Sequence, residues 1–452
     1  MKTVLVSVLH NNQAMGFLAN DSYELLAKDP NIKLVVACPP EKYSFYAQHY
    51  SRPGVIFESV ELEKTSKFDG YMEYLMFSMV NTTAVHYRQK YVLYNQGGWL
   101  KYLSKRFICL ILGSSSLIRR LIRWLDNRLI EISELDEIFK KYQPDLALIL
   151  DILHPKSIRF IRSAKKFKVF SIGIVRSWDN LSSKGAVRVV PDKVIVQNQT
   201  MKKEAKKLGD VKPENVYISG VQVFDMYYGY KPTPKDEFYK KVGATLGKRL
   251  ILFAPYFGYY SDSVAEIIEI LDRAVKDGSL PYDVQFLVRF PPVRPGSNLK
   301  RLESSNIIYY TPGTPFYLED KLEFEFTRDD IRILADSMYH CPVTINFAST
   351  MTIDAAAFDA PIINIAFDGY QQRHFKKSVR LIYNYDHYQP ILKSGGLRLA
   401  GSKEELFKQI NMYLEHPEID HEGRAKIIKE FCGEIDGKAG ERIYQFVINH
   451  LK

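Results

Sequence analysis

The stretch INFASTMTIDAAAFDAPIINIAF, from Ile345 to Phe367, decides the fold class of this protein. Val343–Asn346 and Ile362–Ala366 are short apolar runs, which predict two buried strands. Between them, Thr350–Phe358 has the alanine-rich composition of a short helix. Strands that are joined by a helix lie parallel in one sheet, so this stretch predicts an α/β fold.

The turn before this helix carries three hydroxyl groups, from Ser349, Thr350 and Thr352. Free backbone N–H groups and the helix dipole favour an anion at such a turn, and hydroxyls add hydrogen bonds to a phosphate. Asp354 lies four residues after Thr350 on the same helix face, where a carboxylate could accept hydrogen bonds from a ribose. Alternatively, Ser349 only caps the helix and Asp354 complements its dipole.

Strands and helices alternate in the same way on both sides of a Pro-containing stretch at 230–247. This pattern predicts two Rossmann-like domains facing across a cleft, at 1–230 and 245–415, followed by C-terminal helices at 416–452. Ligands of such sheets bind at the carboxyl ends of the strands. The predicted strands outside the opening stretch are Thr3–Leu9, Ile32–Cys38, 54–60, Pro144–Leu153, Val169–Val175, 192–198, 215–220, 249–256, 284–290 and 306–311.

The composition of the 452 residues is that of a folded protein with an excess of positive charge, +10 from 62 Lys and Arg against 52 Asp and Glu. Such a charge suits nucleic acid, an anionic membrane or an anionic substrate. No RNA-binding signature accompanies it, so we expect no nucleic-acid partner. The four cysteines are far apart and lie beside apolar residues, which indicates buried thiols in a reducing compartment.

A region at 70–130 interrupts the α/β pattern and holds nine basic residues but only two acidic ones. Within it, 99–128 mixes Trp, Leu and Ile with Lys and Arg, as in a basic amphipathic helix on an anionic membrane surface. The alternative is an ordinary amphipathic helix that packs on the sheet. No apolar run approaches the roughly 18 residues that span a bilayer, and the N-terminus alternates like a strand rather than a signal peptide. We therefore expect a cytoplasmic protein, a candidate for peripheral attachment to the inner face of the membrane.

A polar loop follows the strand at Val169–Val175, at the carboxyl edge of the first predicted sheet. Loops of this content at a strand end are typical of binding sites, and Gly185 permits a turn there. Asp179 is a candidate catalytic residue. The candidate substrate-binding residues of this loop are Arg176, Trp178, Asn180, Ser182 and Lys184.

Two further strand ends carry candidate residues. His10 ends the first strand, where an imidazole can act as a general base on an acceptor hydroxyl; Asp151 and His154 are alternatives for that role. Arg289 ends a strand of the second domain and could neutralise a phosphate. A solvated loop is the alternative explanation there.

Motifs for metals and common cofactors are absent from the sequence. It contains no HExxH, no cysteine cluster, no GxGxxG after the first strand and no GxxxxGK[ST]. We expect no metal and no cofactor.

These stretches together resemble the GT-B glycosyltransferase superfamily, in particular bacterial surface-polysaccharide and teichoic-acid-type transferases and the related UDP-N-acetylglucosamine 2-epimerases. The resemblance is carried by RSWDNLSSKG, DKVIVQNQTMKKEA with VYISGVQVFD, NFASTMTIDAAAFDAPIINIAF and FCGEIDGKAGERI. It implies a metal-independent enzyme with a nucleotide-sugar donor in the second domain and an acceptor in the first.

The resemblance also implies roles for single residues. Phosphate contacts would fall on Ser349 and Thr350, and the ribose contact on Asp354, where relatives more usually carry Glu. The C-terminal helix, including Glu441–Leu451, would cross back to the first domain. The catalytic acids of the epimerases are not recognisable, and VRFPP replaces the usual His-Pro after its strand.

The favoured function is therefore transfer of a sugar to a cell-surface glycan or lipid-linked acceptor. A nucleotide-sugar 2-epimerase or a glycerophosphate-type transferase is the alternative among enzymes. From another class, the alternative is a non-catalytic module that binds membranes or RNA. The sequence leaves open the donor, the acceptor and the stereochemical outcome.

Overall fold

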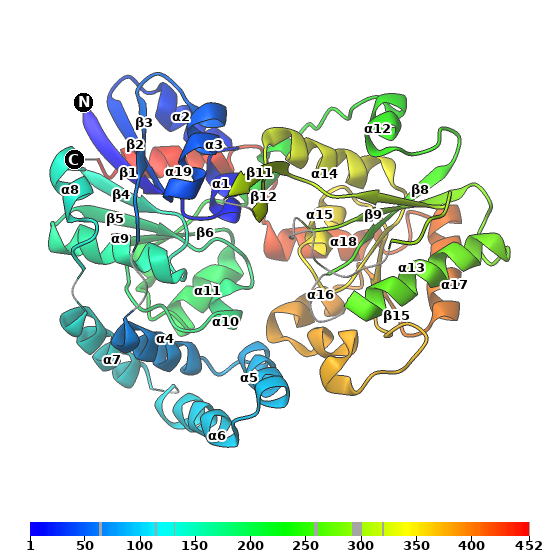
Figure 1. Ribbon diagram of the computed structural model, residues 1–452, viewed down its shortest axis with the longest axis horizontal. Helices are drawn as coiled ribbons and strands as arrows, with labels where there is room; N and C mark the ends of the chain where they lie inside the picture. Colours follow the sequence, from blue (N-terminus) through cyan, green and yellow to red (C-terminus); the bar gives the residue numbers. More distant parts are fainter. Residues whose placement is uncertain are drawn as a thin grey trace. The chain divides into compact units, whose positions relative to one another are not determined.

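The computed structural model describes residues 1–62, 66–113, 115–130, 132–256, 261–291, 301–318 and 321–451. The chain forms two compact units (Figure 1), of which unit 1 is Met1–Tyr228 with Cys432–Lys452 and unit 2 is Gly229–Phe431. Each unit contains one parallel sheet that is covered by helices. The predicted α/β fold with two Rossmann-like domains is confirmed.

The sheet of unit 1 has the strand order β3-β2-β1-β4-β5-β6-β7, and all neighbours are parallel. Its inner strands are almost continuously buried, as expected when helices cover both faces, whereas the edge strands β3 and β7 are only partly buried. The order reverses between β1 and β4, which makes this point the topological switch of the sheet. The strands are β1 (Lys2–Ser7), β2 (Ile32–Cys38), β3 (Val55–Ser59), β4 (Leu146–Ile149), β5 (Phe170–Ile174), β6 (Lys193–Val196) and β7 (Val216–Ile218).

Right-handed crossovers place the helices that follow β1 and β2 on one face of this sheet and those that follow β4 and β6 on the other. The stretch after β1 forms two helices, and Asn20 lies in extended conformation between them while its amide donates to the Met15 carbonyl. The helices are α1 (Asn11–Phe17), α2 (Asp21–Lys28), α3 (Pro40–Tyr50), α8 (Asp136–Tyr142), α9 (Pro155–Lys166), α10 (Asn180–Ser183) and α11 (Gln199–Lys207).

The last helix, α19 (Ala439–Ile448), belongs to unit 1 and packs against α2. The Asp225 carboxylate accepts hydrogen bonds from the first backbone N–H groups of α19, at Ala439 and Gly440 (3.0 and 2.6 Å). The predicted return of the C-terminal helix to the first domain is confirmed. The predicted C-terminal segment 416–452 is divided, because α18 (His421–Phe431) packs on α15 (Met351–Ala357) of unit 2.

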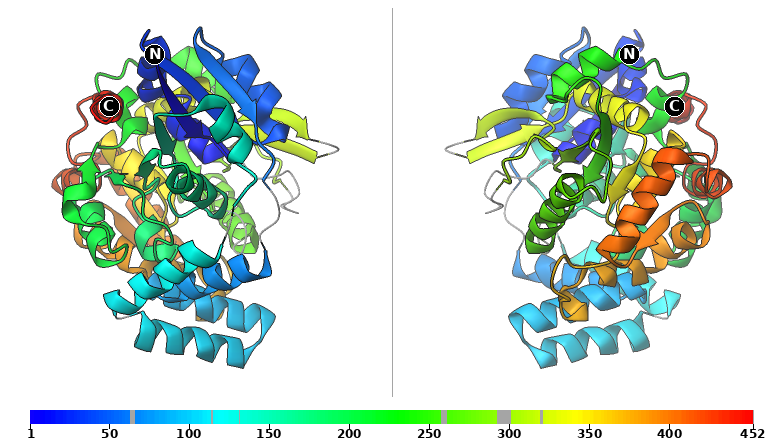
Figure 2. Two further views of the ribbon diagram at one scale, coloured as in Figure 1. Left: turned by 90° about the vertical axis from the view of Figure 1, so that its left-hand side faces the viewer. Right: turned by 90° about the vertical axis from the view of Figure 1, so that its right-hand side faces the viewer.

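Between β3 and β4, unit 1 carries a helical insertion (Figures 1 and 2). Its apolar residues form a small core of their own with Ala186, built on α4 and the turn that follows it. The insertion consists of α4 (Lys67–Ser78), α5 (Thr83–Gln96), α6 (Trp99–Phe107), the π-helix η1 (Ile108–Leu112) and α7 (Ser116–Leu129).

The sheet of unit 2 has the order β10-β9-β8-β13-β14-β15, again parallel, with its switch point between β8 and β13. The opening stretch forms β13, α15 and β14, as predicted. The elements are β8 (Arg249–Ala254), α13 (Ser261–Lys276), β9 (Val284–Arg289), β10 (Ile307–Tyr310), the antiparallel hairpin β11 (Thr314–Leu318) and β12 (Lys321–Glu325), α14 (Arg328–His340), β13 (Thr344–Asn346), α15 (Met351–Ala357), β14 (Ile362–Ile365), α16 (Gln389–Lys393), β15 (Arg398–Ala400) and α17 (Lys403–Glu415), with α12 (Lys235–Val242) ahead of β8.

Candidate functional site

The switch point of the first sheet gathers three ionisable side chains. His10 follows β1, and Asp151 and His154 follow the neighbouring strand β4. His10 Nε2 lies 3.9 Å from Asp151 Oδ2, and the two imidazole rings lie 4.7 Å apart. The Asp151 side chain is fully buried and accepts a hydrogen bond from the Leu153 N–H at 3.1 Å. The carboxylate is therefore held rigidly beneath the imidazole of His10.

Two cations from the predicted polar loop reach the same carboxylate. Arg176 Nε lies 3.1 Å from Asp151 Oδ2, and Lys184 Nζ lies 3.7 Å from it. Gln197, which follows β6, donates to the Arg176 carbonyl at 2.9 Å and fixes the start of the loop. One buried carboxylate thus faces a guanidinium, an ammonium and two imidazoles, so this edge favours an anionic ligand.

The electrostatics keep both imidazoles neutral. Burial, with added repulsion from His154 and Arg176, lowers the pKa of His10 to about 3, although Asp151 opposes the shift. Burial also lowers the pKa of His154, again against the attraction of Asp151. For Lys184, burial lowers the ammonium pKa, and Arg176 adds to the effect. Neutral imidazoles at physiological pH are able to accept a proton.

The other candidate residues of the polar loop make contacts within the loop or are buried. The Asp179 carboxylate accepts hydrogen bonds from the hydroxyls of Ser177 (2.6 Å) and Ser183 (3.3 Å). Trp178, Asn180 and Ser182 are buried. As predicted, Gly185 makes the turn: its φ is +101°, and a Cβ there would lie 2.6 Å from Phe77 Cα.

A small cavity of about 50 Å³ lies beside the cluster within unit 1. Arg176 lines it together with Gln13 of α1 and with Gln197 and Gly220, which follow β6 and β7. The amide of Gln13 is held on both sides, accepting from the Leu9 N–H and donating to Ser157. The walls of this cavity are therefore preorganised.

The switch point of the second sheet carries hydroxyl groups instead. Ser349 lies in the turn between β13 and α15, and its buried hydroxyl has no hydrogen-bond partner among the described residues. The next residue, Thr350, is exposed and starts α15, where its carbonyl accepts from the Ile353 and Asp354 N–H groups. No side-chain hydrogen bond caps α15 at Thr350.

Thr352 lies below this turn in a buried polar network. Its hydroxyl lies 2.8 Å from the Tyr388 hydroxyl and 3.2 Å from the Asn346 amide. Tyr388 also donates to Asn364 Oδ1 at 2.6 Å. Complete burial and these partners mean that Thr352 fixes the start of α15 from below.

The remaining two candidates of unit 2 are both almost completely buried. Asp354 is 5% exposed on the first turn of α15. Arg289 is 8% exposed at the end of β9, beside its register partner Tyr310. The proline-rich loop beyond it, at 292–300, lies outside the described residues. In the part of the chain that the structure describes, no group of three or more His, Cys, Asp or Glu is arranged to hold a metal ion.

The structure thus unites His10, Arg176 and Lys184 with the two residues that sequence reasoning gave only as alternatives, Asp151 and His154. The signal for Asp151 was its place directly after an apolar strand. The cavity residues Gln13, in α1, and Gln197, directly after β6, were missed, because a single amide carries no motif.

No family model and no curated protein matches the chain. Solved structures do match it over nearly its whole length. They include the UDP-GlcNAc 2-epimerase from Neisseria meningitidis bound to UDP-GlcNAc (TM-score 0.57, 11% identity, 99% of this chain and 100% of that chain). A glycosyltransferase from Rickettsia africae matches with a TM-score of 0.50 and 11% identity, over 99% of this chain and 98% of that chain.

The wall teichoic acid polymerase TagF is similar as well, with a TM-score of 0.54 and 12% identity over 100% of this chain and 89% of that chain. These proteins share the arrangement of two parallel-sheet α/β domains. The chain therefore has the GT-B fold, as the sequence resemblance implied.

Proposed function

We propose that this protein is a glycosyltransferase that moves a sugar from a nucleotide-sugar to a hydroxyl of a cell-surface glycan or lipid-linked acceptor, without a metal ion. The observation that carries the proposal is the switch-point cluster of unit 1, in which a neutral His10 lies beside a buried carboxylate and two cations. Its composition provides both a proton acceptor and positive charge for an anionic substrate.

In the proposed reaction, His10 accepts the proton of the acceptor hydroxyl while that oxygen bonds to the anomeric carbon. The bond from this carbon to the nucleotide phosphate breaks, and the phosphate leaves with the electron pair. An imidazole with a pKa near 3 is a weak base. An anionic substrate beside Arg176 and Lys184 offsets their repulsion, which raises the pKa of His10 toward the useful range.

Unit 2 is proposed to bind the nucleotide through the turn at Ser349 and Thr350, with Asp354 as the ribose contact and Arg289 near the phosphates. Positive charge and N–H groups that meet the growing charge of the leaving group replace a metal ion. Support comes from the buried hydroxyl of Ser349, which has no hydrogen-bond partner in the part of the chain that the structure describes, and from UDP-GlcNAc in a solved structure of similar fold. A cytoplasmic location is part of the proposal and agrees with four free, buried cysteines.

A nucleotide-sugar 2-epimerase is the second candidate, because a structure of similar fold is such an enzyme. The two reactions differ in the need for an acceptor. An epimerase converts a nucleotide-sugar by itself, whereas a transferase releases the free nucleotide in proportion to the acceptor that is glycosylated.

The test is a thermal-shift screen against UDP-, CMP-, CDP-, GDP- and TDP-linked sugars, followed by product analysis with the donor that stabilises the protein. A donor at 100 times its Kd adds about 2.7 kcal/mol of stability. Conversion of that donor to its 2-epimer without acceptor would replace the transferase proposal by the epimerase. Absence of any shift across the screen would contradict both.

A further inference from the structure

Helix α7 of the insertion has the reverse of the usual polarity. Its buried residues are all charged, namely Arg119, Arg123 and Asp126. Its outward residues include large apolar side chains, with Leu117 at 74% and Trp124 at 55% exposure. An amphipathic helix that packed on the sheet would show the opposite arrangement, so the sequence-based alternative of simple packing does not describe this face.

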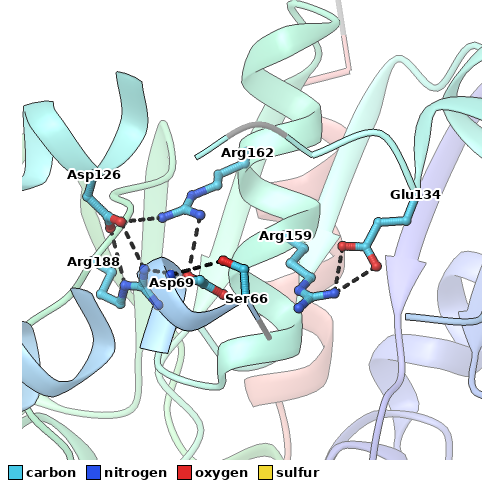
Figure 3. A network of polar contacts seen from close by, with 7 residues as sticks. All are labelled: Ser66, Asp69, Asp126, Glu134, Arg159, Arg162 and Arg188. Atoms are coloured by element: carbon cyan, nitrogen blue, oxygen red, sulfur yellow. Dashed lines mark hydrogen bonds and ion pairs between the residues drawn. The ribbon is translucent and has the colours of Figure 1, made fainter. Parts of the chain in front are cut away.

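Buried counter-charges hold the charged face inward. Arg119 forms a two-pronged ion pair with Asp210, at 2.8 and 2.6 Å. Asp126 is paired with Arg188 and Arg162, each at 2.8 Å, and Asp69 joins the same network (Figure 3). Because removal of one partner would leave a charge buried and unpaired, these pairs specify a single orientation of α7.

Helix α6 also carries exposed apolar side chains. Leu100, Leu103 and Phe107 are exposed there at 85%, 56% and 60%, at positions that share one side of the helix. Figures 1 and 2 show α6 and α7 at one end of unit 1, away from its sheet. Apolar area costs about 25 cal/mol per Å² in water. Exposed apolar area of this extent marks an interaction surface.

The charges beside this face fit an anionic partner. Lys101, Arg120 and Arg128 are exposed, and the Arg128 guanidinium lies 5.5 Å from the centre of the Trp124 ring. The only acidic residue between positions 99 and 130 is Asp126, which is fully buried. Exposed cations next to Trp and Leu are typical of helices that lie in the interface of an anionic bilayer.

We propose that the outward face of α6 and α7 docks this protein on an anionic lipid bilayer, with the apolar side chains inserted and the flanking cations at the head groups. None of the described helices is long and apolar enough to cross a bilayer, so docking in the plane of the surface is the fitting mode. Docking on a bilayer does not depend on the proposed sugar transfer, so the two proposals can be tested separately.

The test is co-sedimentation of the full chain with vesicles of phosphatidylglycerol and phosphatidylcholine in equal parts. The variant Leu117→Ser/Leu121→Ser/Trp124→Ser is expected to lower binding roughly 100-fold, from the apolar area that it removes. The variant Arg120→Gln/Arg128→Gln is expected to lower it about 10- to 30-fold, at about 1 kcal/mol per cation. Both variants change exposed side chains only, and thermal unfolding checks that they fold.

The matched control is Leu246→Ser/Tyr282→Ser, which removes exposed apolar side chains from unit 2 and should bind as the unchanged protein does. Vesicles of phosphatidylcholine alone should bind at least 10-fold more weakly. Failure to bind anionic vesicles, or equal binding by the triple variant, would overturn the proposal. So would a dimer in solution that the triple variant dissociates while vesicle binding stays unchanged, because a second copy would then cover the face.

Discussion

The switch points of the two sheets occupy equivalent places but carry different chemistry. In unit 1 the residues are ionisable: His10 Nε2 and Lys184 Nζ each lie within 4 Å of the Asp151 carboxylate. In unit 2 the turn before α15 carries neutral groups, the hydroxyls of Ser349 and Thr352 and the amide of Asn346, and the carboxylate of Asp354 lies on the first turn of the helix. An ionisable edge is suited to moving a proton, whereas a neutral edge with N–H and O–H groups is suited to binding an anion without titrating.

The largest expected effect is on catalysis, from the ionisable edge. His10→Gln should lower kcat by about 100- to 10,000-fold, because the proton acceptor is lost. The Kd of the nucleotide should stay within about twofold, since its proposed site is in unit 2. Steady-state kinetics with the donor identified by the thermal screen, together with calorimetry, measure both quantities. His416→Gln, at an exposed position of unit 2, is the matched control.

If His10→Gln keeps full activity, His10 is not the proton acceptor. Asp151 or His154 would then be the candidate for that role. Equal losses of kcat and of nucleotide affinity would contradict the assignment of proton transfer to unit 1 and of nucleotide binding to unit 2.

The second effect is on binding, from the neutral edge. Ser349→Ala/Thr350→Ala should weaken nucleotide binding about 100-fold or more, since each of the two hydrogen bonds to a charged phosphate contributes roughly 1.5–3 kcal/mol. Calorimetry gives the Kd directly. Ser279→Ala, an exposed serine at the opposite edge of the same sheet, is the control. Unchanged affinity in the double variant would assign the hydroxyls to helix capping alone.

Thr352→Val tests whether Thr352 stabilises the start of α15 or contacts the nucleotide directly. The buried network would lose a hydroxyl that lies 2.8 Å from Tyr388, which should cost about 1–3 kcal/mol of unfolding free energy. Chemical denaturation of unit 2 measures this loss. Weaker nucleotide binding with unchanged stability would instead make Thr352 a direct contact.

The smallest expected effect is on the pH dependence of the free energy of unfolding, and it comes from His10 at the ionisable edge of unit 1. The pKa of His10 is about 3 in the folded protein against 6.5 for an unperturbed imidazole. The unfolded chain therefore takes up a proton below pH 6.5 that the folded chain does not. The stability that His10 contributes is present above pH 6.5 and is lost as the pH falls from 6.5 toward 3.

At pH 5.5 this loss amounts to about 1.4 kcal/mol, and His10→Gln should abolish it. All three tryptophans lie in unit 1, so urea unfolding followed by tryptophan fluorescence at pH 7.5 and 5.5 reports on that unit. An identical pH dependence in the variant would mean that His10 titrates normally in the folded protein.

Much of the fold was predictable because the local signals agree with the tertiary structure. Buried parallel strands are continuous apolar runs, so β13 and β14 could be located from the sequence alone. Short strands such as β15 carry too few residues for a pattern. The hairpin β11–β12 was missed, although the KLEFE sequence of β12 alternates between charged and apolar residues as a half-buried strand does.

The sequence by itself determined the two α/β units and the presence of polar residues at the strand ends, because apolar periodicity and turn chemistry are local properties. Only the tertiary structure decided which of those residues meet. His10 and Asp151 are far apart in the chain, and the β1–β4 pairing brings them together. The orientation of α7 was equally undetermined, because its pattern is amphipathic in either direction. Buried partners at Asp210, Arg162 and Arg188 turn its charged face inward, since a buried charge is tolerated only when it is paired.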